Sequence, residues 1–266
     1  LKVTASSSAC SPTVVGTVVD TNATTKALTG NENTLIRYKS TAKCTLTATP
    51  KNSATISTTK IGGSAVTGTS SGGVVTATKN YTSVSATSFS FDATDSRGYS
   101  GSQTVNPSVI AYIQLTINPT VERPVPTGDT VELSFSGNYY RGSFGAYSNT
   151  LTIRYRYKET TTAAFSGGWT TVPSTSIVYG TGTYRTSAAI TLDDTFDYRK
   201  SYDFQIQAYD GANGTALTTV TRDLVIKRGI PVFDWGENDF NFHVPVKIGD
   251  TTRTEQQLQQ LLALLS

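Results

Sequence analysis

Short runs of alternating apolar and polar residues constrain the fold of this chain more than any other feature. Clear examples are Cys44–Thr49, Thr130–Phe135, Leu151–Tyr155 and Tyr202–Ala208. Alternation places the apolar side chains of a strand on one face and the polar ones on the other, which is typical of a sheet with one buried side. Turn-forming residues separate the runs, so the sequence predicts an all-β fold of immunoglobulin-like or fibronectin-like β-sandwiches.

An internal repeat predicts two such sandwiches in tandem. The pattern Phe89-x-Phe91-x-Ala93-x-Asp95 returns as Phe204-x-Ile206-x-Ala208-x-Asp210, and a glycine follows each copy soon afterwards, Gly98 and Gly211. Both copies predict a strand that runs into a hairpin turn. A weaker echo, which needs a one-residue gap, pairs Asn33–Tyr38 with Asn149–Tyr155.

The length of 266 residues accommodates two sandwiches and a tail. We expect domains at 1–118 and 119–228, joined within Asn118–Gly128, where three prolines predict a semi-rigid connector. The chain does not begin with Met, so we expect it to be a piece of a longer polypeptide.

The C-terminal part changes character. Residues 229–250 are dense in aromatics and predict a β segment, and 251–266 predict a helix capped by Thr251 or Thr252. One apolar stripe marks that short helix, which predicts assembly with further copies; docking on its own sandwich is the alternative. The predicted oligomer interface consists of Leu258, Leu261, Leu262, Leu265, Phe240, Phe242, Val244 and Trp235.

Residues for catalysis or metal binding are sparse. His243 is the one histidine and lies in a predicted strand. The run Gly68–Gly72 matches Gly-x-Ser-x-Gly in letters, but strand-like rather than helical sequence follows it, so it predicts a turn and not a nucleophile elbow. Cys10 and Cys44 are too far apart for a zinc site and leave open a disulfide or two free thiols. Calcium is a weaker possibility around Asp92, Asp95 and the Asp210 turn. We therefore expect no enzyme, no cofactor and no metal.

Charge and hydropathy argue against other partners. The net charge is +3, and the 22 Lys and Arg are scattered rather than clustered, which is unlike a nucleic-acid-binding surface. No apolar run approaches the roughly 20 residues that span a bilayer.

Aromatic residues cluster in the loops of the second expected domain and are the candidate ligand contacts. Such rings offer a large contact area to a sugar or a protein; packing at the sandwich edge is the alternative. The candidates are Tyr139, Tyr140, Phe144, Tyr147 and Trp169.

The segment Pro231–Val246 closely resembles a signature of minor structural proteins in the tails of siphophages that infect Gram-positive bacteria. Ala27–Gly30, Pro50–Ile56 and Asp95–Gly98 resemble the first Ig-like domain of that family, and Gly142–Leu151 with Tyr155–Lys158 resembles the second. His243 departs from the pattern, in which Asn is usual.

This resemblance implies a virion protein, extracellular after release, in a tail fibre or near the baseplate. It implies a homotrimer that contacts other tail proteins and attaches to the host, with cell-wall polysaccharide as a possible ligand, and it implies no catalytic residues. Two alternatives remain open: a stalk segment of a bacterial surface adhesin, and a carbohydrate-binding accessory module of a cell-wall hydrolase.

Overall fold

A computed structural model describes residues 7–229, 233–235, 240–242, 246–248, 251–253, 256–257, 259–260 and 263. Antiparallel sheets dominate it, so the predicted all-β class is confirmed. The chain divides into two compact units. Unit 1 holds 1–115, 139–151 and 209–218, and unit 2 holds 116–138, 152–208 and 219–266. Unit 1 thus includes two segments from the range expected to form the second domain.

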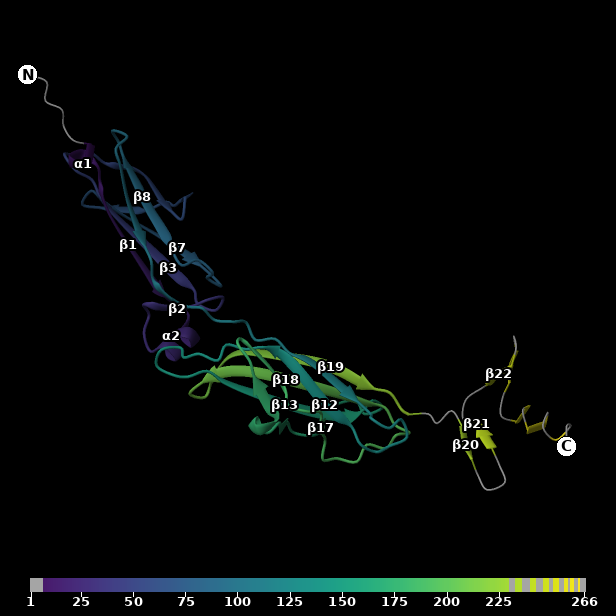
Figure 1. Cartoon of the computed structure of the whole chain (residues 1–266). Helices are drawn as coiled ribbons and strands as arrows, with labels where there is room; N and C mark the ends of the chain where they lie inside the picture. Colours follow the sequence, from purple (N-terminus) through teal and green to yellow (C-terminus); the bar gives the residue numbers. More distant parts are fainter. Residues whose placement is uncertain are drawn as a thin grey trace, which may run out of the picture. The chain divides into compact units, whose positions relative to one another are not determined.

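The first sandwich has two four-stranded sheets (Figure 1). One sheet has the order β1-β3-β7-β6 and the other β5-β4-β8-β9. With the strands lettered along the chain, these orders are A-B-E-D and C′-C-F-G, the arrangement of Ig-like domains. The strands are β1 (Thr13–Asp20), β3 (Ala42–Thr49), β4 (Ile56–Ile61), β5 (Ser64–Ala65), β6 (Thr69–Ser71), β7 (Val74–Tyr81), β8 (Phe89–Asp95) and β9 (Ser100–Val105).

The core of this sandwich comes from the alternation seen in the sequence. Every second residue of β3 and β8 is buried, and both strands contribute to one hydrophobic cluster. Phe91 of β8 lies so close to Gly16 of β1 that a Cβ at residue 16 would meet its ring at 2.3 Å. The two inner faces therefore interdigitate across the sandwich.

The second sandwich repeats the strand order of the first. Its sheets are β11-β12-β16-β15, with β17 also paired to β12, and β14-β13-β18-β19. This is again A-B-E-D with C′-C-F-G, except that two short strands share the E position. The strands are β11 (Asn118–Glu122), β12 (Glu132–Asn138), β13 (Thr150–Glu159), β14 (Thr170–Thr171), β15 (Ile177–Tyr179), β16 (Thr183–Thr186), β17 (Ile190–Thr191), β18 (Tyr202–Ala212) and β19 (Thr215–Ile226).

The internal repeat is confirmed, because its two copies are the equivalent F strands β8 and β18. The weaker echo is wrong: Thr34–Ile36 is β2, paired in parallel with β10 (Ser108–Ile110), whereas the later copy begins the C strand β13. The expected turn at Gly211 is also wrong. Strand β18 continues to Ala212, and Asn213 and Gly214, both with positive φ, make the turn instead.

The proline-rich segment 118–128 is not a connector in its first half. Asn118–Glu122 forms β11 and pairs along its whole length with β12. Proline is compatible with this strand because β11 is at the edge of its sheet, where the missing N–H interrupts no ladder.

A short helix that the apolar pattern of the sequence does not predict lies in unit 1. Asn22 caps α2 (Ala23–Thr29) by accepting hydrogen bonds from the backbone N–H groups of Thr24 and Thr25, and Gly30 ends it in the left-handed conformation. Leu28 of α2 joins a second small core in unit 1, together with Ile36, Tyr112, Phe144 and Ala212. A four-residue helix, α1 (Ser7–Cys10), precedes the first sandwich.

The tail contains two short strand pairs. Strand β20 (Phe233–Trp235) pairs with β21 (Phe240–Phe242), and β22 (Val246–Ile248) pairs with β23 (Thr251–Arg253). The expected helical start at residue 251 is therefore wrong. Gln256, Gln257, Gln259, Gln260 and Ala263 are helical and exposed.

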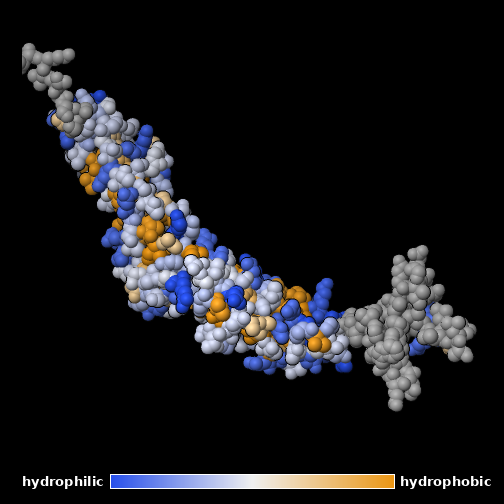
Figure 2. Space-filling model, in the orientation of Figure 1, coloured by the Kyte–Doolittle hydropathy of each residue, from blue (hydrophilic) through white to orange (hydrophobic). Residues whose placement is uncertain are grey.

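On the face that Figure 2 shows, most of the described surface is polar and apolar residues form small separate patches. The exposed large apolar side chains include Val15, Val125 and Val225, which are far apart in the sequence. Within the described part of the chain, no helix has the length and apolar character needed to cross a membrane.

Cys10 and Cys44 are free thiols, and burial raises the pKa of Cys44 to about 11.

Candidate functional site

The loop aromatics proposed as ligand contacts divide into core and surface residues. Phe144 is fully buried and Tyr139 nearly so, and the Tyr139 hydroxyl donates to the Asn149 carbonyl at 2.7 Å. Tyr140 packs on Phe144 with ring centroids 5.7 Å apart. Tyr147 is exposed. Packing, the alternative considered for these residues, is therefore what the structure shows for Tyr139 and Phe144.

The predicted oligomer interface is mostly beyond what the structure describes. Leu258, Leu261, Leu262, Leu265 and Val244 lie outside the described residues. Trp235 and Phe240 occupy paired positions of β20 and β21, and Phe242 pairs with Phe233. The interface remains a prediction.

The two repeated aspartates have opposite electrostatic environments. Asp95 is buried, and burial acts to raise its pKa, but hydrogen bonds from the Arg97 side chain and from the N–H groups of Tyr99 and Arg97 hold that pKa below its usual value. The Arg97–Asp95 pair is 2.8 Å long. Both carboxylate oxygens of Asp95 are thus used inside the protein.

Asp210 lies in unit 1 with neutral partners. Its Oδ2 accepts from the Tyr112 hydroxyl at 2.8 Å and from the Asn149 amide at 3.0 Å, while Oδ1 has no hydrogen-bond partner. Burial raises the pKa of this carboxyl group. The calcium hypothesis finds no support here, since no group of three His, Cys, Asp or Glu that could hold a metal occurs in the described part of the chain.

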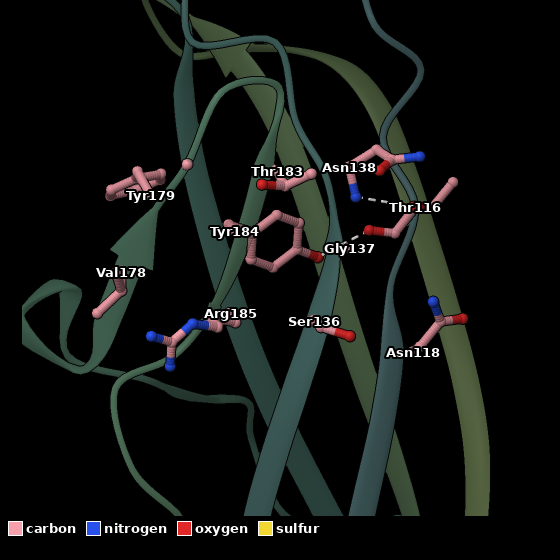
Figure 3. Close-up of a pocket in the computed structure, with 11 residues that line it drawn as sticks. Thr116, Asn118, Ser136, Gly137, Asn138, Val178, Tyr179, Thr183, Tyr184 and Arg185 are labelled. Carbon is pink, nitrogen blue, oxygen red and sulfur yellow. Dashed lines mark hydrogen bonds between the residues drawn. The ribbon is translucent and has the colours of Figure 1, made fainter.

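A polar depression of about 560 Å³ on the second sandwich is the candidate site (Figure 3). It lies over β11, β12, β15 and β16, and all its residues belong to unit 2. We call it the polar depression; it is lined by Thr116, Asn118, Ser136, Gly137, Asn138, Val178, Tyr179, Gly180, Thr183, Tyr184 and Arg185.

Strand register arranges the polar depression as two rows across the sheet. In the first row, Asn118 is opposite Ser136, Ser136 opposite Arg185, and Arg185 opposite Val178. Four strands at the usual spacing make such a row about 14 Å long.

The second row runs beside the first. Asn138 is opposite Thr183, and the Asn138 N–H donates to the Thr116 hydroxyl at 2.9 Å. Asn118, Ser136, Asn138, Thr183 and Arg185 are all exposed, because alternation along β12 and β16 turns them away from the core.

Tyr184 and Gly137 form the floor. Tyr184 is buried with its ring centroid 6.0 Å from that of Phe135, and its hydroxyl donates to the Thr116 carbonyl at 2.8 Å. A Cβ at residue 137 would lie 2.0 Å from that same carbonyl oxygen and 2.8 Å from the Tyr184 ring. Only glycine permits this close approach of β12, the Thr116 backbone and the tyrosine.

Arg185 is the one charged residue among those lining the polar depression. Its Nη1 donates to the neighbouring Thr186 carbonyl at 3.1 Å. The remaining lining groups are hydroxyls, side-chain amides, Tyr179 and Val178, so the surface offers hydrogen bonds and a single positive charge.

The opposite sheet of this sandwich carries a different polar face, which we call the cation ladder: Arg154, Arg156 and Lys158 with Trp169 and Phe165. The Trp169 ring lies 4.7 Å from the Arg154 guanidinium and 4.6 Å from that of Arg156. Phe165 lies 4.8 Å from Arg156 and 5.6 Å from the Lys158 ammonium. Trp169, predicted as a ligand contact, is therefore stacked between two arginines and half-buried.

Cross-strand partners hold the cation ladder. Arg154 Nε donates to Gln207 and Arg156 Nε to Gln205, both at 2.8 Å. Lys158 forms an ion pair of 2.7 Å with Asp203. Nearby, burial and a hydrogen bond with Asp194 raise the pKa of Tyr157 to about 12.

No protein-family model matches this chain, and no curated protein matches it. Among solved structures, the chain is similar to the Yersinia pseudotuberculosis adhesin InvE, at 9% sequence identity. The match covers 89% of this chain and 72% of that chain, with a TM-score of 0.24. At this TM-score the similarity carries no argument about fold or function.

Proposed function

We propose that this chain is a structural and adhesive component of a phage tail, in a fibre or beside the baseplate, and not an enzyme. The observation that carries the proposal is the repetition of one Ig-like strand order in two sandwiches, the second of which has a polar, hydrogen-bonding depression on its outer face. The likeness of Pro231–Val246 to a siphophage tail signature supports the same role.

The chemistry of the described residues fits attachment better than catalysis. Asp95 is bonded to Arg97, and Asp210 to Tyr112 and Asn149, so the buried carboxylates of the repeated strands have structural partners. The polar depression contains no acidic side chain and no histidine that could act as a general acid or base. Its groups suit reversible hydrogen bonding to a surface.

Assembly would multiply this contact. If the C-terminal segment joins three copies, three weak contacts to one surface become avid, because the second and third binding events are intramolecular. Light scattering on the chain with and without residues 251–266 tests this step. We expect a trimer that becomes a monomer on truncation; a monomer in both cases would contradict it.

A matched pair of variants separates assembly from general disturbance of the tail. Leu258→Asp with Leu262→Asp should dissociate the trimer. Gln256→Asp with Gln260→Asp changes helical, exposed positions that are close in the sequence, and it should leave the trimer intact.

The adhesive role is tested on host cells and virions. Antibodies against the whole chain should label the tails of the phage that encodes it and block adsorption. The purified chain should bind host cell walls without releasing soluble sugar. Label confined to the capsid, or release of wall fragments, would overturn the proposal.

The second candidate is a carbohydrate-binding accessory module of a wall hydrolase, which the polar depression favours. A catalytic domain encoded in the same polypeptide would select this candidate over the tail protein.

A further inference from the structure

The polar depression has the size and rigidity of a binding site. Its volume of about 560 Å³ falls within the roughly 300–1,000 Å³ usual for ligand pockets. The exposed groups of both rows stand on paired strands rather than on free loops, so their spacing is fixed by the sheet. A ligand that matches the rows would meet a preformed surface.

The lining groups define the ligand chemistry. Asn118 and Asn138 each provide a donor and an acceptor, and Ser136 and Thr183 provide hydroxyls that do both. Groups of this kind, spread over three adjacent strands and about 10 Å, suit a molecule that carries many hydroxyls. An apolar ligand would leave them desolvated and unpaired, at a cost in affinity.

One edge of the polar depression is less polar. Figure 3 shows Tyr179 and Val178 on the side of Arg185, across the site from Asn118 and Asn138. Val178 is 40% exposed. An apolar contact beside a hydrogen-bonding strip matches the C–H face and hydroxyl edge of a sugar ring.

Arg185 adds a requirement for negative charge. Its guanidinium is exposed in the middle of the first row, and none of the residues that line the depression is acidic. A guanidinium binds carboxylate or phosphate through two parallel hydrogen bonds. The arginines of the cation ladder differ, because Gln205, Gln207 and Trp169 engage them.

We propose that the polar depression binds a saccharide that carries an anionic group, a carboxylate or a phosphate, with that group on Arg185 and the ring hydroxyls on Asn118, Ser136, Asn138 and Thr183. This inference rests on the proposed attachment function and names the chemistry of the surface to which the chain attaches.

Calorimetry with three oligosaccharides tests the ligand class on the whole chain. A hyaluronan hexasaccharide presents carboxylates, a phosphorylated oligomannose presents phosphates, and maltohexaose presents neither. We expect at least one anionic probe to bind and maltohexaose to bind at least about tenfold more weakly, since the charged hydrogen bonds are lost. Equal binding of all three, or no detectable binding of either anionic probe, would overturn the proposal.

A matched pair of arginines tests the residue. Arg185 and Arg222 are both exposed strand residues whose Nη1 donates to an adjacent backbone carbonyl. Arg185→Gln should weaken binding of the anionic oligosaccharide about tenfold or more, and Arg222→Gln should leave that binding unchanged. Thermal unfolding of both variants should match the parent chain, which shows that the loss is local.

Host adsorption separates the two levels of inference. If Arg185→Gln adsorbs to host cells as well as the parent chain does, the saccharide site is wrong while the attachment function stands. If the parent chain itself does not adsorb, the proposed function fails.

Discussion

The two outer faces of the second sandwich use their arginines in opposite ways. On the C′-C-F-G sheet, Arg154 and Arg156 lie between aromatic rings and bond to Gln207 and Gln205. On the A-B-E-D sheet, Arg185 bonds to a backbone carbonyl and is flanked by Ser136 and Val178. Both faces come from the same alternation along strands.

The two faces differ in the residue on the neighbouring strand that lies beside each cation. A glutamine or aspartate there accepts hydrogen bonds from the cation, so the cation has a structural role. A serine or valine leaves the guanidinium available to a ligand. The cation ladder therefore contributes stability, and the polar depression contributes binding, which the following substitutions test in order of expected effect.

Gly137→Ala should produce the largest loss of stability, measured as the free energy of unfolding. The new Cβ would meet the Thr116 carbonyl and the Tyr184 ring, so the Thr116 backbone or Tyr184 must move, at a cost of about 1–3 kcal/mol. Urea unfolding measures the loss. Gly167→Ala, where nothing lies within 4 Å of the added Cβ, is the control. Equal stability of the two variants would show that the floor of the depression is not tightly packed.

Trp169→Ala should lower the free energy of unfolding somewhat less than Gly137→Ala does. The substitution removes two cation–π contacts, each worth about 0.5–1 kcal/mol at an exposed site. Binding of the anionic oligosaccharide should be unchanged. Val178→Ala, at the edge of the polar depression, should shift the unfolding free energy by less than about 0.5 kcal/mol. A larger loss for Val178 than for Trp169 would reverse the assignment of the two faces.

Asp203→Asn should have a smaller and pH-dependent effect. The Lys158–Asp203 pair is partly exposed, so its loss should cost about 0.2–1 kcal/mol. Hydrogen bonds from Lys158 and Thr160 lower the pKa of Asp203 from its ordinary 3.8. A carboxyl group with a lowered pKa stabilises the fold above the ordinary value and loses that contribution as the pH falls through the folded value.

The test is urea unfolding of the parent and the variant across acidic pH. The difference in unfolding free energy should shrink below pH 3.8. Asp223→Asn, at an exposed position of β19, serves as the reference substitution. A difference that stays constant into strong acid would mean that the ion pair is not its source.

Arg185→Gln should have the smallest effect on stability, below about 0.5 kcal/mol. Arg156→Gln should lose about 1 kcal/mol or more, because it removes contacts with two rings and Gln205. Thermal unfolding measured side by side decides between them. A greater loss at Arg185 would place that residue among the structural cations.

The sequence contained much of the fold but not the candidate site. A strand with one buried face has apolar residues at every second position, and this pattern can be read from the sequence. The pattern is so similar in the two F strands, Phe89–Asp95 and Phe204–Asp210, that it also reveals the tandem repeat. The polar depression left no such mark, because its rows join residues far apart in the chain through strand pairing. Local alternation around Ser136 and Arg185 predicts only that these side chains face outward.

Other expectations failed for reasons that a single segment cannot reveal. Phe144 sits in a loop rich in glycine and serine, which suits either ligand contact or packing; its core neighbours Leu28 and Tyr112 come from distant segments. Helix α2 has local signals in the sequence, because Asn22 caps its start and Gly30 ends it. The helix has only seven residues, however, which is too short for an apolar periodicity to be recognised. Pro119 predicted a connector, but proline is equally compatible with an edge strand, so the residue alone could not distinguish the two.

Amide chemical-shift mapping with the anionic oligosaccharide tests the central claim most directly, since it reports which face of the second sandwich meets the ligand. We predict shifts concentrated at 136–138 and 183–185 of β12 and β16, with little change at 154–158 and 203–207. Shifts centred on the cation ladder, or none on either face, would contradict the assignment of binding to the polar depression.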